Sequence, residues 1–395
     1  MTNQVNKAQF IIIAAVGGVA LLFFLIFKGV IPGLQKKEVN VNKMVEGTLT
    51  IWGTVDNENT LEGAIKAFEK IYPNLNIAYR QFTDEARYET ELLEALAVRK
   101  GPDIFTIRNR GLQRNREKIA FAPQNQISLL SLRRLFPRVV EDDFVESGQV
   151  GALPLYVDTL ALIYNRNMLN QAGYVYPPAT WEEVEAMARK VNIALGGSPD
   201  IIARSADIVE LIALQEAAKE GRVIQGSATN DSAGTRALEF YKKFKYEGLP
   251  YSPDAFGAGR IAMMFGYASD LKSIKARTGF IEPLVAKAPQ IKDSENPVAL
   301  ANYQGYTVSN QSPIQGIAWQ FIIMLTTNEG LAEAYANMTG RPPALNSLIA
   351  ARLNDPSAGA LAEQSLIARS LRAPDERRQK EEVENAIRSV LKTEN

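Results

Sequence analysis

The stretch Leu153-Pro-Leu-Tyr-Val-Asp-Thr-Leu-Ala-Leu-Ile-Tyr-Asn165 places a polar segment directly before an apolar one. Residues 160–164 are uncharged and apolar, which predicts a buried β-strand. Tyr156 and Asp158 precede this strand, and a carboxylate beside a buried strand is costly unless a partner compensates it. We therefore interpret the stretch as a connection between two lobes, with Asp158 facing the cleft between them.

The composition is that of a folded chain with room for two domains. The chain has 395 residues, of which 46% are apolar and 22% are charged. Lysine plus arginine and aspartate plus glutamate number 44 each, so the chain has no basic field that would attract nucleic acid. We therefore exclude nucleic acid as a partner.

The chain contains neither cysteine nor histidine. Without cysteine it has no disulfide, no thiolate metal site, no cysteine nucleophile and no lipid attached through an N-terminal cysteine. Without histidine it has no Ser-His-Asp triad and no histidine-ligated zinc. Sites made of carboxylates alone remain open, such as a glycosidase pair or a magnesium or calcium cage. We expect no cofactor and no bound metal.

The N-terminal region predicts a membrane anchor. Residues 10–27 carry no charge, and the run is at the lower end of the length of a membrane-spanning helix. A cleaved signal peptide and a buried helix are the alternatives, but the run is long for a signal core and no clear cleavage site follows it. We assign residues 1–33 to the anchor and 34–46 to an exposed linker. More lysines follow the run than precede it, so charge alone favours a cytoplasmic body.

Strand and helix patterns alternate after the linker. They follow in the order strand, helix, strand, helix, strand, at residues 48–52, 61–71, 75–79, 88–96 and 103–107. This order predicts a parallel sheet with helical crossovers. Ligands of such sheets bind beyond the carboxyl ends of the strands, so residues 52–59 and 108–110 are expected to share one rim.

The second half of the chain also has clear local patterns. Thr180-Trp-Glu-Glu183 is a capping box, so Trp181 is expected to pack beside the start of a helix. Asp207 is expected to cap the next helix. Residues 259–267 predict an apolar strand that ends in a turn. Trp319 shares the helical spacing of its apolar neighbours and is expected in the core.

Five segments carry a family resemblance: the strand at residues 48–52, Ala67-Phe-Glu-Lys-Ile-Tyr-Pro-Asn74, Gly101-Pro-Asp-Ile-Phe105, the opening stretch continued to Leu169, and Pro177-Pro-Ala-Thr-Trp-Glu-Glu183. Their order and spacing resemble the family 1 extracellular solute-binding proteins. These are the sugar-binding receptors of ABC importers, and maltose-binding protein is the familiar example. The resemblance covers residues 47–395.

The resemblance implies a fold and a division of the chain. The fold would be α/β and periplasmic-binding-protein type II-like, with two α/β lobes joined by a hinge with three crossings, preceded by the N-terminal transmembrane helix. Lobe 1 would contain residues 47–157 and 302–341. Lobe 2 would contain residues 158–301 and 342–395.

The resemblance also implies positions at the cleft. Tyr267 would stack on the solute, Tyr303 and Gln304 would meet the cleft at the second crossing, and Arg341 would meet it at the third. Leu371 stands where related sequences often carry an aromatic residue, which weakens sugar stacking on that side. Together with the rim residues, the candidate ligand-binding residues are Trp52, Asp56, Arg108, Asn109, Tyr156, Asp158, Tyr267, Tyr303, Gln304 and Arg341.

We expect a non-catalytic receptor tethered outside the membrane. Aromatic faces and planar polar groups in one cleft are what sugar recognition needs, although a smaller sugar, a sugar phosphate or another polar solute would also fit. The receptor would close by hinge motion and pass its solute to ABC permease subunits. A sensor component that signals through a partner, and a surface glycoside hydrolase using Asp158 and Asp56, are the alternatives. The outside location follows from the resemblance and conflicts with the lysine count.

Overall fold

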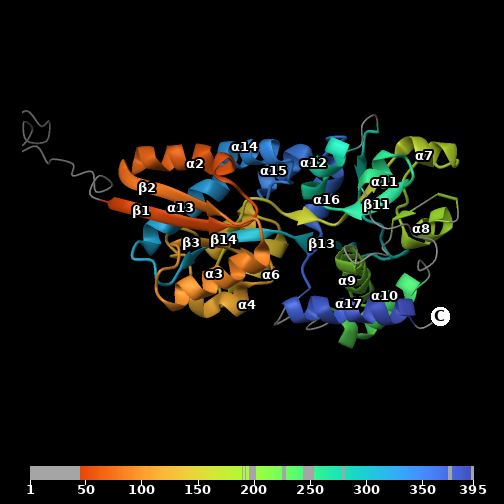
Figure 1. Ribbon diagram of the computed structural model, residues 1–395, viewed down its shortest axis with the longest axis horizontal. Coiled ribbons are helices and arrows are strands. Elements are labelled where there is room, and N and C mark those ends of the chain that lie inside the picture. Colours follow the sequence, from red (N-terminus) through yellow and green to blue (C-terminus); the bar gives the residue numbers. More distant parts are fainter. Residues whose placement is uncertain are drawn as a thin grey trace, which may run out of the picture.

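The computed structural model describes residues 45–188, 190–191, 193–194, 202–224, 228–242, 253–277, 281–371 and 376–392. Within this part of the chain, two groups of elements lie at opposite ends of an elongated molecule (Figure 1). Each group surrounds a hydrophobic core of its own, with Leu49 and Phe105 in one and Leu162 and Phe265 in the other. We call the two groups lobe 1 and lobe 2.

Lobe 1 is built on a sheet with the strand order β2-β1-β3-β14-β4, and β7 pairs separately with β14. The strands are β1 (Glu46–Gly53), β2 (Asn74–Gln81), β3 (Ile104–Arg108), β4 (Ile119–Ala120), β7 (Leu153–Pro154) and β14 (Gln304–Ser309). β1 runs parallel to both β2 and β3, which confirms the predicted parallel sheet with helical crossovers. β14 runs antiparallel to β3, with Gln304 opposite Arg108.

Helices cover both faces of this sheet. They are α2 (Glu58–Ile71), α3 (Glu85–Ala97), α4 (Leu112–Asn115), α5 (Leu129–Leu135), α6 (Arg138–Phe144), α13 (Gln315–Thr327), α14 (Glu329–Thr339) and α15 (Asn346–Arg352), and the short strands β5 (Val145–Glu146) and β6 (Gln149–Val150) form a hairpin beside them. Figure 1 shows α2 and α14 above the sheet and α3, α4 and α6 below it. Trp319 on α13 is fully buried and donates from Nε1 to the carbonyl of Ala120 at 2.8 Å, as expected of a core residue.

Lobe 2 has a smaller mixed sheet with the strand order β10-β11-β9-β12. Its strands are β9 (Ala161–Tyr164), β10 (Ile193–Ala194), β11 (Met263–Gly266) and β12 (Leu284–Ala286), and its helices are α7 (Arg166–Gln171), α8 (Trp181–Ala188), α9 (Ile202–Lys219), α10 (Ser232–Lys242), α11 (Pro253–Gly257), α12 (Ala268–Arg277), α16 (Gly359–Leu366) and α17 (Glu376–Lys392). β9 confirms the strand predicted at residues 160–164. The strand predicted at 259–267 is shorter, since only Met263–Gly266 pair with β9.

Two local predictions in lobe 2 have different outcomes. Thr180 and Glu183 exchange side-chain and backbone hydrogen bonds, which confirms the capping box. Trp181 beside it is fully buried and donates from Nε1 to Gln215 at 2.7 Å. The predicted cap at Asp207 is wrong, because α9 begins five residues earlier, at Ile202.

Three short strands join the lobes. β8 (Asp158–Thr159), β13 (Ala299–Asn302) and β15 (Ala368–Arg369) come from three distant parts of the chain and pair in the order β15-β13-β8. Core residues change from lobe 1 to lobe 2 between Val157 and Leu160, and change back between Leu300 and Ala301. We call β8, β13 and β15 the hinge sheet.

The predicted boundary between lobe 1 and lobe 2 at residue 342 is wrong. Residues 342–395 were expected in lobe 2, but Ala344, Leu345 and Leu348 pack in the lobe 1 core. α15 is held there because Asn346 donates to the backbone carbonyl of Arg134 at 3.0 Å. The chain therefore leaves lobe 1 after α15 and reaches lobe 2 with α16, whose Leu361 packs on Ala161 of β9.

The predicted anchor, residues 1–33, lies outside the described residues, as does the linker up to residue 44. Glu46, the last residue of the predicted linker, already belongs to β1. Among the described residues, no helix combines the length and the apolar content needed to cross a bilayer.

Candidate functional site

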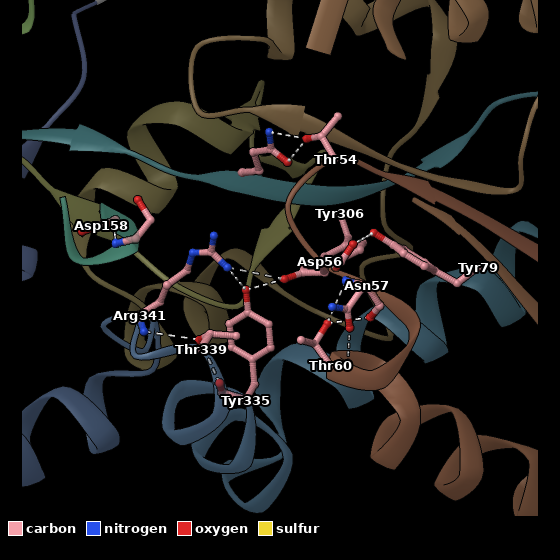
Figure 2. Close-up of polar contacts among 12 residues, drawn as sticks. Thr54, Asp56, Asn57, Thr60, Tyr79, Asp158, Tyr306, Tyr335, Thr339 and Arg341 are labelled. Atoms are coloured by element: carbon pink, nitrogen blue, oxygen red, sulfur yellow. Dashed lines mark hydrogen bonds and ion pairs between the residues drawn. The ribbon is translucent and has the colours of Figure 1, made fainter. Parts of the chain in front are cut away.

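Asp56 is the centre of a buried polar cluster in lobe 1 (Figure 2). Its side chain is 3% exposed and accepts hydrogen bonds from the hydroxyl groups of Tyr306 and Tyr335, the latter at 2.6 Å. Arg341 Nη1 lies 3.8 Å from Asp56 Oδ1 and 3.3 Å from the Tyr335 hydroxyl, to which it donates. Burial raises the pKa of Asp56, although the two tyrosines and Arg341 act in the opposite direction.

The loop that carries Asp56 is held by two sets of contacts where it enters α2. Asn57 and Thr60 form a capping box at the start of α2. The Tyr79 hydroxyl donates to the backbone carbonyl of Asp56 at 2.6 Å. Gly53 leaves room for that hydroxyl, because a Cβ there would lie 2.6 Å from it. The polar loop after β1 is therefore rigidly placed at the carboxyl end of the sheet.

Arg341 and Tyr156 form the face of the cluster nearest the lobe connection. The guanidinium carbon of Arg341 lies 4.9 Å from the centre of the Tyr156 ring, a cation–π arrangement. Tyr156 also stacks on Tyr335, with ring centres 6.3 Å apart. Arg341 Nε is buried and has no hydrogen-bond partner within the described residues. Three predicted site residues, Asp56, Tyr156 and Arg341, are therefore in one cluster.

Arg108 and Gln304 lie on the adjacent rim, opposite each other on β3 and β14. The Gln304 side chain exchanges hydrogen bonds with the hydroxyl of Thr54, at 2.9 and 3.1 Å. Arg108 holds Glu85 through two nitrogens, one of them Nη2 at 2.6 Å. Burial alone would raise the pKa of Glu85, but its hydrogen bond and ion pair with Arg108 lower it.

A surface pocket opens beside this rim. Its walls come from α3, β3, α4 and the loop between them, and its lining includes Glu85, Tyr88, Glu89, Arg108, Arg110, Arg114, Asn115 and Gln304. Two of the predicted site residues, Arg108 and Gln304, therefore face one pocket that is rich in charged and planar polar groups. Such groups suit a polar ligand.

Trp52 lies apart from both groups, at the end of β1. It is half-buried and packs on Phe82, with ring centres 5.2 Å apart. The guanidinium carbon of Arg80 lies 4.8 Å from the centre of its ring. Its ring is thus already in contact with protein side chains, and its predicted contact with a solute stays a prediction.

Asp158 has a structural role different from the predicted one. It lies in the hinge sheet, is 2% exposed, and accepts hydrogen bonds from the backbone N–H groups of Thr159, Ala268 and Ser269 at 2.9 to 3.1 Å. Ala268 and Ser269 begin α12, so this carboxylate stabilises the N-terminus of a helix in lobe 2. Burial raises the pKa of Asp158 to about 6 despite these donors. The carboxylate of Asp158, which was expected to face the cleft, therefore accepts hydrogen bonds from the backbone instead.

Tyr267 is also turned toward protein. It is 5% exposed, and its hydroxyl donates to Asp207 at 3.1 Å. This bond gives Asp207, which does not cap α9, a partner across lobe 2. The expected stacking of Tyr267 on solute would require this buried ring to become accessible.

The other two candidates, Asn109 and Tyr303, belong to a buried network at the hinge sheet. The Tyr303 hydroxyl donates to Asp143 at 2.7 Å, and Tyr303 is 1% exposed. Asn109 Nδ2 donates to the Ser370 hydroxyl at 2.6 Å, and that hydroxyl donates to the same Asp143 oxygen at 2.6 Å. Burial raises the pKa of Asp143 to about 7, although both hydroxyl donors lower it. We call Asn109, Asp143, Tyr303 and Ser370 the hinge network.

Sequence reasoning missed several members of these groups. Tyr306 lies two residues after Gln304 on one strand, so the alternation of strand side chains could have indicated that they share a face. Tyr335, Asp143 and Ser370 gave no local signal, since each meets its partner only through the fold. Among the described residues, no cluster of three or more metal-ligand side chains occurs.

The fold and these contacts define a class of protein. Two α/β lobes with separate cores are joined by a three-stranded hinge sheet, and the hinge network lies beside that sheet. Residues 63–359 match the bacterial extracellular solute-binding protein family, which is more than half of the chain. The chain belongs to this family of binding proteins.

Individual relatives are more distant. A probable ABC transporter-binding protein of Deinococcus radiodurans is 38% identical over 57 residues, which are 14% of this chain and only 13% of that protein. A solute-binding protein of Thermotoga lettingae, solved with α-D-tagatose bound, has a TM-score of 0.69 at 21% identity, covering 88% of this chain and 95% of its own. An ABC substrate-binding protein of Listeria monocytogenes, in complex with cycloalternan, has a TM-score of 0.68 at 16% identity, covering 88% and 97%. These structures share the maltose-binding-protein-like two-lobed fold with this chain.

Proposed function

We propose that the chain is a membrane-tethered, extracytoplasmic solute receptor of an ABC importer. It would bind a carbohydrate or a similar small polar solute between its lobes and deliver it to permease subunits. The observation that carries this proposal is the hinge sheet, because three short strands joining two separate cores allow one lobe to rotate against the other. Family membership supports the same conclusion.

Contacts around the rim favour a compact solute over a long oligosaccharide. All three tryptophans lie in the described residues. Trp181 and Trp319 are fully buried, and Trp52 is half-buried with Arg80 against its ring. Few flat aromatic faces are thus offered to a sugar chain, whereas Arg108 and Gln304 line a pocket with planar polar groups.

We propose that Arg108, Gln304 and Arg341 contact the solute directly. The Arg108 side chain is 35% exposed and that of Arg341 is 17% exposed, so both can be reached from solvent. Asp56 and Tyr156 would act through Arg341, because they hold its guanidinium in place.

The two carboxylates that could have formed a glycosidase pair, Asp56 and Asp158, are arranged in a way that favours a receptor without catalysis. Asp56 accepts from two tyrosines, and Asp158 accepts from three backbone N–H groups. A general acid must transfer its proton to the substrate, and a nucleophile must reach it. Both carboxylates are buried and engaged with protein partners, which favours binding over hydrolysis.

Thermal unfolding in the presence of candidate solutes tests the binding function. Monosaccharides, sugar phosphates, amino acids and maltodextrins are added separately to the purified body of the protein. A solute at 100 times its Kd stabilises the native state by about 2.7 kcal/mol, which raises the melting temperature. Arg108→Ala should weaken binding of the active solute at least about tenfold, a loss that corresponds to about 1.4 kcal/mol.

Arg133→Ala is the matched control, because Arg133 pairs with Glu141 in a comparable exposed ion pair of lobe 1 and does not line the pocket. It should leave binding unchanged. The proposal is refuted if no solute in the panel raises the melting temperature, or if the bound solute is hydrolysed.

The tether is tested separately in intact cells. Residues 10–27 would hold the protein in the membrane fraction, and a chain lacking residues 1–33 should be recovered in the soluble fraction. Protease added outside intact cells should digest the body of the protein. If the cells have an outer membrane, digestion is expected once that membrane is made permeable. Digestion only after lysis of the cytoplasm would contradict the extracytoplasmic location.

A further inference from the structure

One buried ion pair joins the lobes directly. Arg110 Nη2 in lobe 1 lies 2.9 Å from Glu210 Oε2 in lobe 2, and the two side chains are 9% and 4% exposed. Arg110 follows β3 and precedes Leu112 of the lobe 1 core, whereas Glu210 lies on α9 between Val209 and Leu211 of the lobe 2 core. We call Arg110 and Glu210 the interlobe pair.

Both members are held by their own lobes. The backbone beside Arg110 is fixed because the N–H of Asn109 donates to the carbonyl of Tyr303 at 3.0 Å. On the other side, Gln379 of α17 donates to Glu210 Oε1 at 3.3 Å and is itself 2% exposed. Rotation of one lobe against the other must therefore stretch the contact between Arg110 and Glu210, since neither side chain can easily follow its partner.

The charges around the pair are not symmetric. The positive charge of Arg110 acts on the buried carboxyl group of Asp143 in the hinge network, which it helps to ionise. Glu210 has Arg110 as its ion-pair partner and Gln379 as a neutral donor. Arg110 thus has a second carboxyl group nearby, in its own lobe.

We propose that the interlobe pair is a latch that holds the two lobes together before solute arrives and thereby sets the affinity of the cleft. The inference rests on the proposed function for its biological meaning, since a latch regulates solute binding only in a receptor that binds by hinge closure. Arg110 also lines the pocket beside Arg108 and Gln304, so the latch lies at the edge of the proposed binding surface.

The physical basis is the cost of an uncompensated buried charge. While the lobes are in contact, each charge compensates the other out of water. Removing Arg110 leaves the Glu210 carboxylate buried with one neutral donor, and separation of the lobes is the way to hydrate it. Removing Glu210 instead leaves Arg110 near Asp143. The two single variants should therefore differ, with loss of Arg110 opening the lobes more.

The absence of cysteine makes a direct measurement of lobe spacing possible. Met338 on α14 of lobe 1 and Val175 after α7 of lobe 2 are 55% and 72% exposed. Met338→Cys and Val175→Cys introduce two unique attachment points for spin labels. Pulsed electron–electron double resonance then measures the distribution of distances between the two labels, one on each lobe. No solute is added, so the measurement does not depend on identifying one.

Four variants are compared on this labelled background. Arg110→Gln should raise the population ratio of long to short interlobe distances by at least about tenfold, and Glu210→Gln by less. The double variant should open no more than Arg110→Gln alone, because the two residues act as one unit. Glu216→Gln is the matched control, since Glu216 lies on the same helix but pairs with Arg236 inside lobe 2, at 2.8 Å.

The result has clear alternatives. Unchanged distances in folded Arg110→Gln and Glu210→Gln proteins, or an equal shift in Glu216→Gln, would overturn the latch. If Arg110→Gln does not fold, Arg110→Lys takes its place, because it keeps the charge but loses the fork geometry that reaches Glu210. A protein whose lobes respond as expected but which binds no solute in the thermal panel would retain the latch and refute the proposed function. The two failures are therefore distinguishable.

Discussion

Replacing Asp143 by asparagine should change how the stability of the protein depends on pH. This carboxyl group lies in the hinge network and accepts from Tyr303 and Ser370. Burial raises its pKa to about 7 from the ordinary value of 3.8. The folded chain therefore holds the proton more tightly than the unfolded chain, and the free energy of unfolding must fall as pH rises between these two values.

The size of the effect follows from the same two values. Each pH unit between them is worth about 1.36 kcal/mol, so the full difference is roughly 4 kcal/mol. Below pH 3.8 both states are protonated and this group has no effect on stability. Above about pH 7 the whole loss is present. Asparagine does not titrate in this range. The free energy of unfolding of Asp143→Asn should therefore rise relative to that of the wild type by up to roughly 4 kcal/mol between pH 3.8 and about pH 7.

Urea unfolding at several pH values between 4 and 8, followed by tryptophan fluorescence, measures this difference. Asp56 and Asp158 also have raised pKa values, but they are present in both proteins and cancel in the comparison. Asp142→Asn removes a neighbouring negative charge whose side chain is 21% exposed and paired with Arg138. It serves as the control, and only a small change in the same direction is expected, because burial contributes more than the charge of Asp142 to the raised pKa of Asp143.

Either of two outcomes would contradict this role of Asp143. One is a stability difference between wild type and Asp143→Asn that stays constant within about 0.5 kcal/mol over the whole pH range. The other is the same pH dependence in Asp142→Asn, which would reflect net charge and not the buried carboxyl group.

Three further substitutions test other contacts. Tyr335→Phe removes a hydroxyl donor from the buried Asp56 and should lower the free energy of unfolding by about 1.5–3 kcal/mol in urea; a loss below about 0.5 kcal/mol would show that the bond is replaced. Asp158→Ala removes the acceptor at the start of α12 and should cost about 0.5–2 kcal/mol, with faster hydrogen exchange at the first amides of that helix; unchanged exchange there would contradict the capping role. Gly305→Ala places a Cβ 2.7 Å from the ring of Phe144, and this overpacking should lower stability by about 1–3 kcal/mol in the same urea assay, whereas wild-type stability would mean that the ring yields without cost.

Local patterns were enough to predict several of the elements that build each lobe. Residues 48–52, which alternate between apolar and polar, lie in β1, and the capping box at Thr180 forms as expected. Trp319, which shares the helical spacing of its apolar neighbours, is in the core. These features depend on neighbours a few positions away, and such neighbours are visible in the chain itself. The parallel direction of the first three strands could be predicted because helical patterns alternate with them along the chain.

Partners far apart in the chain could not be predicted in this way. Tyr335 meets Asp56 across 279 positions, and Glu210 meets Arg110 across 100. Asp158 was rightly identified as an acid that needs compensation, but its compensation comes from the start of α12, 110 positions away. Which acid pairs with which donor is decided by the packing of the lobes, and polarity alone does not reveal it.

The position of β14 in the middle of the lobe 1 sheet affects when this chain can fold during its synthesis. β14 lies between β3 and β4, yet Gln304 on it bonds to Thr54 across 250 positions. The first sheet cannot be completed until the part of lobe 2 that precedes β14 has been translated, and pairings over such separations form slowly because loop closure is entropically costly. We therefore expect the nascent chain to remain unfolded until late. That delay suits a polypeptide that must pass through a translocation channel before it folds.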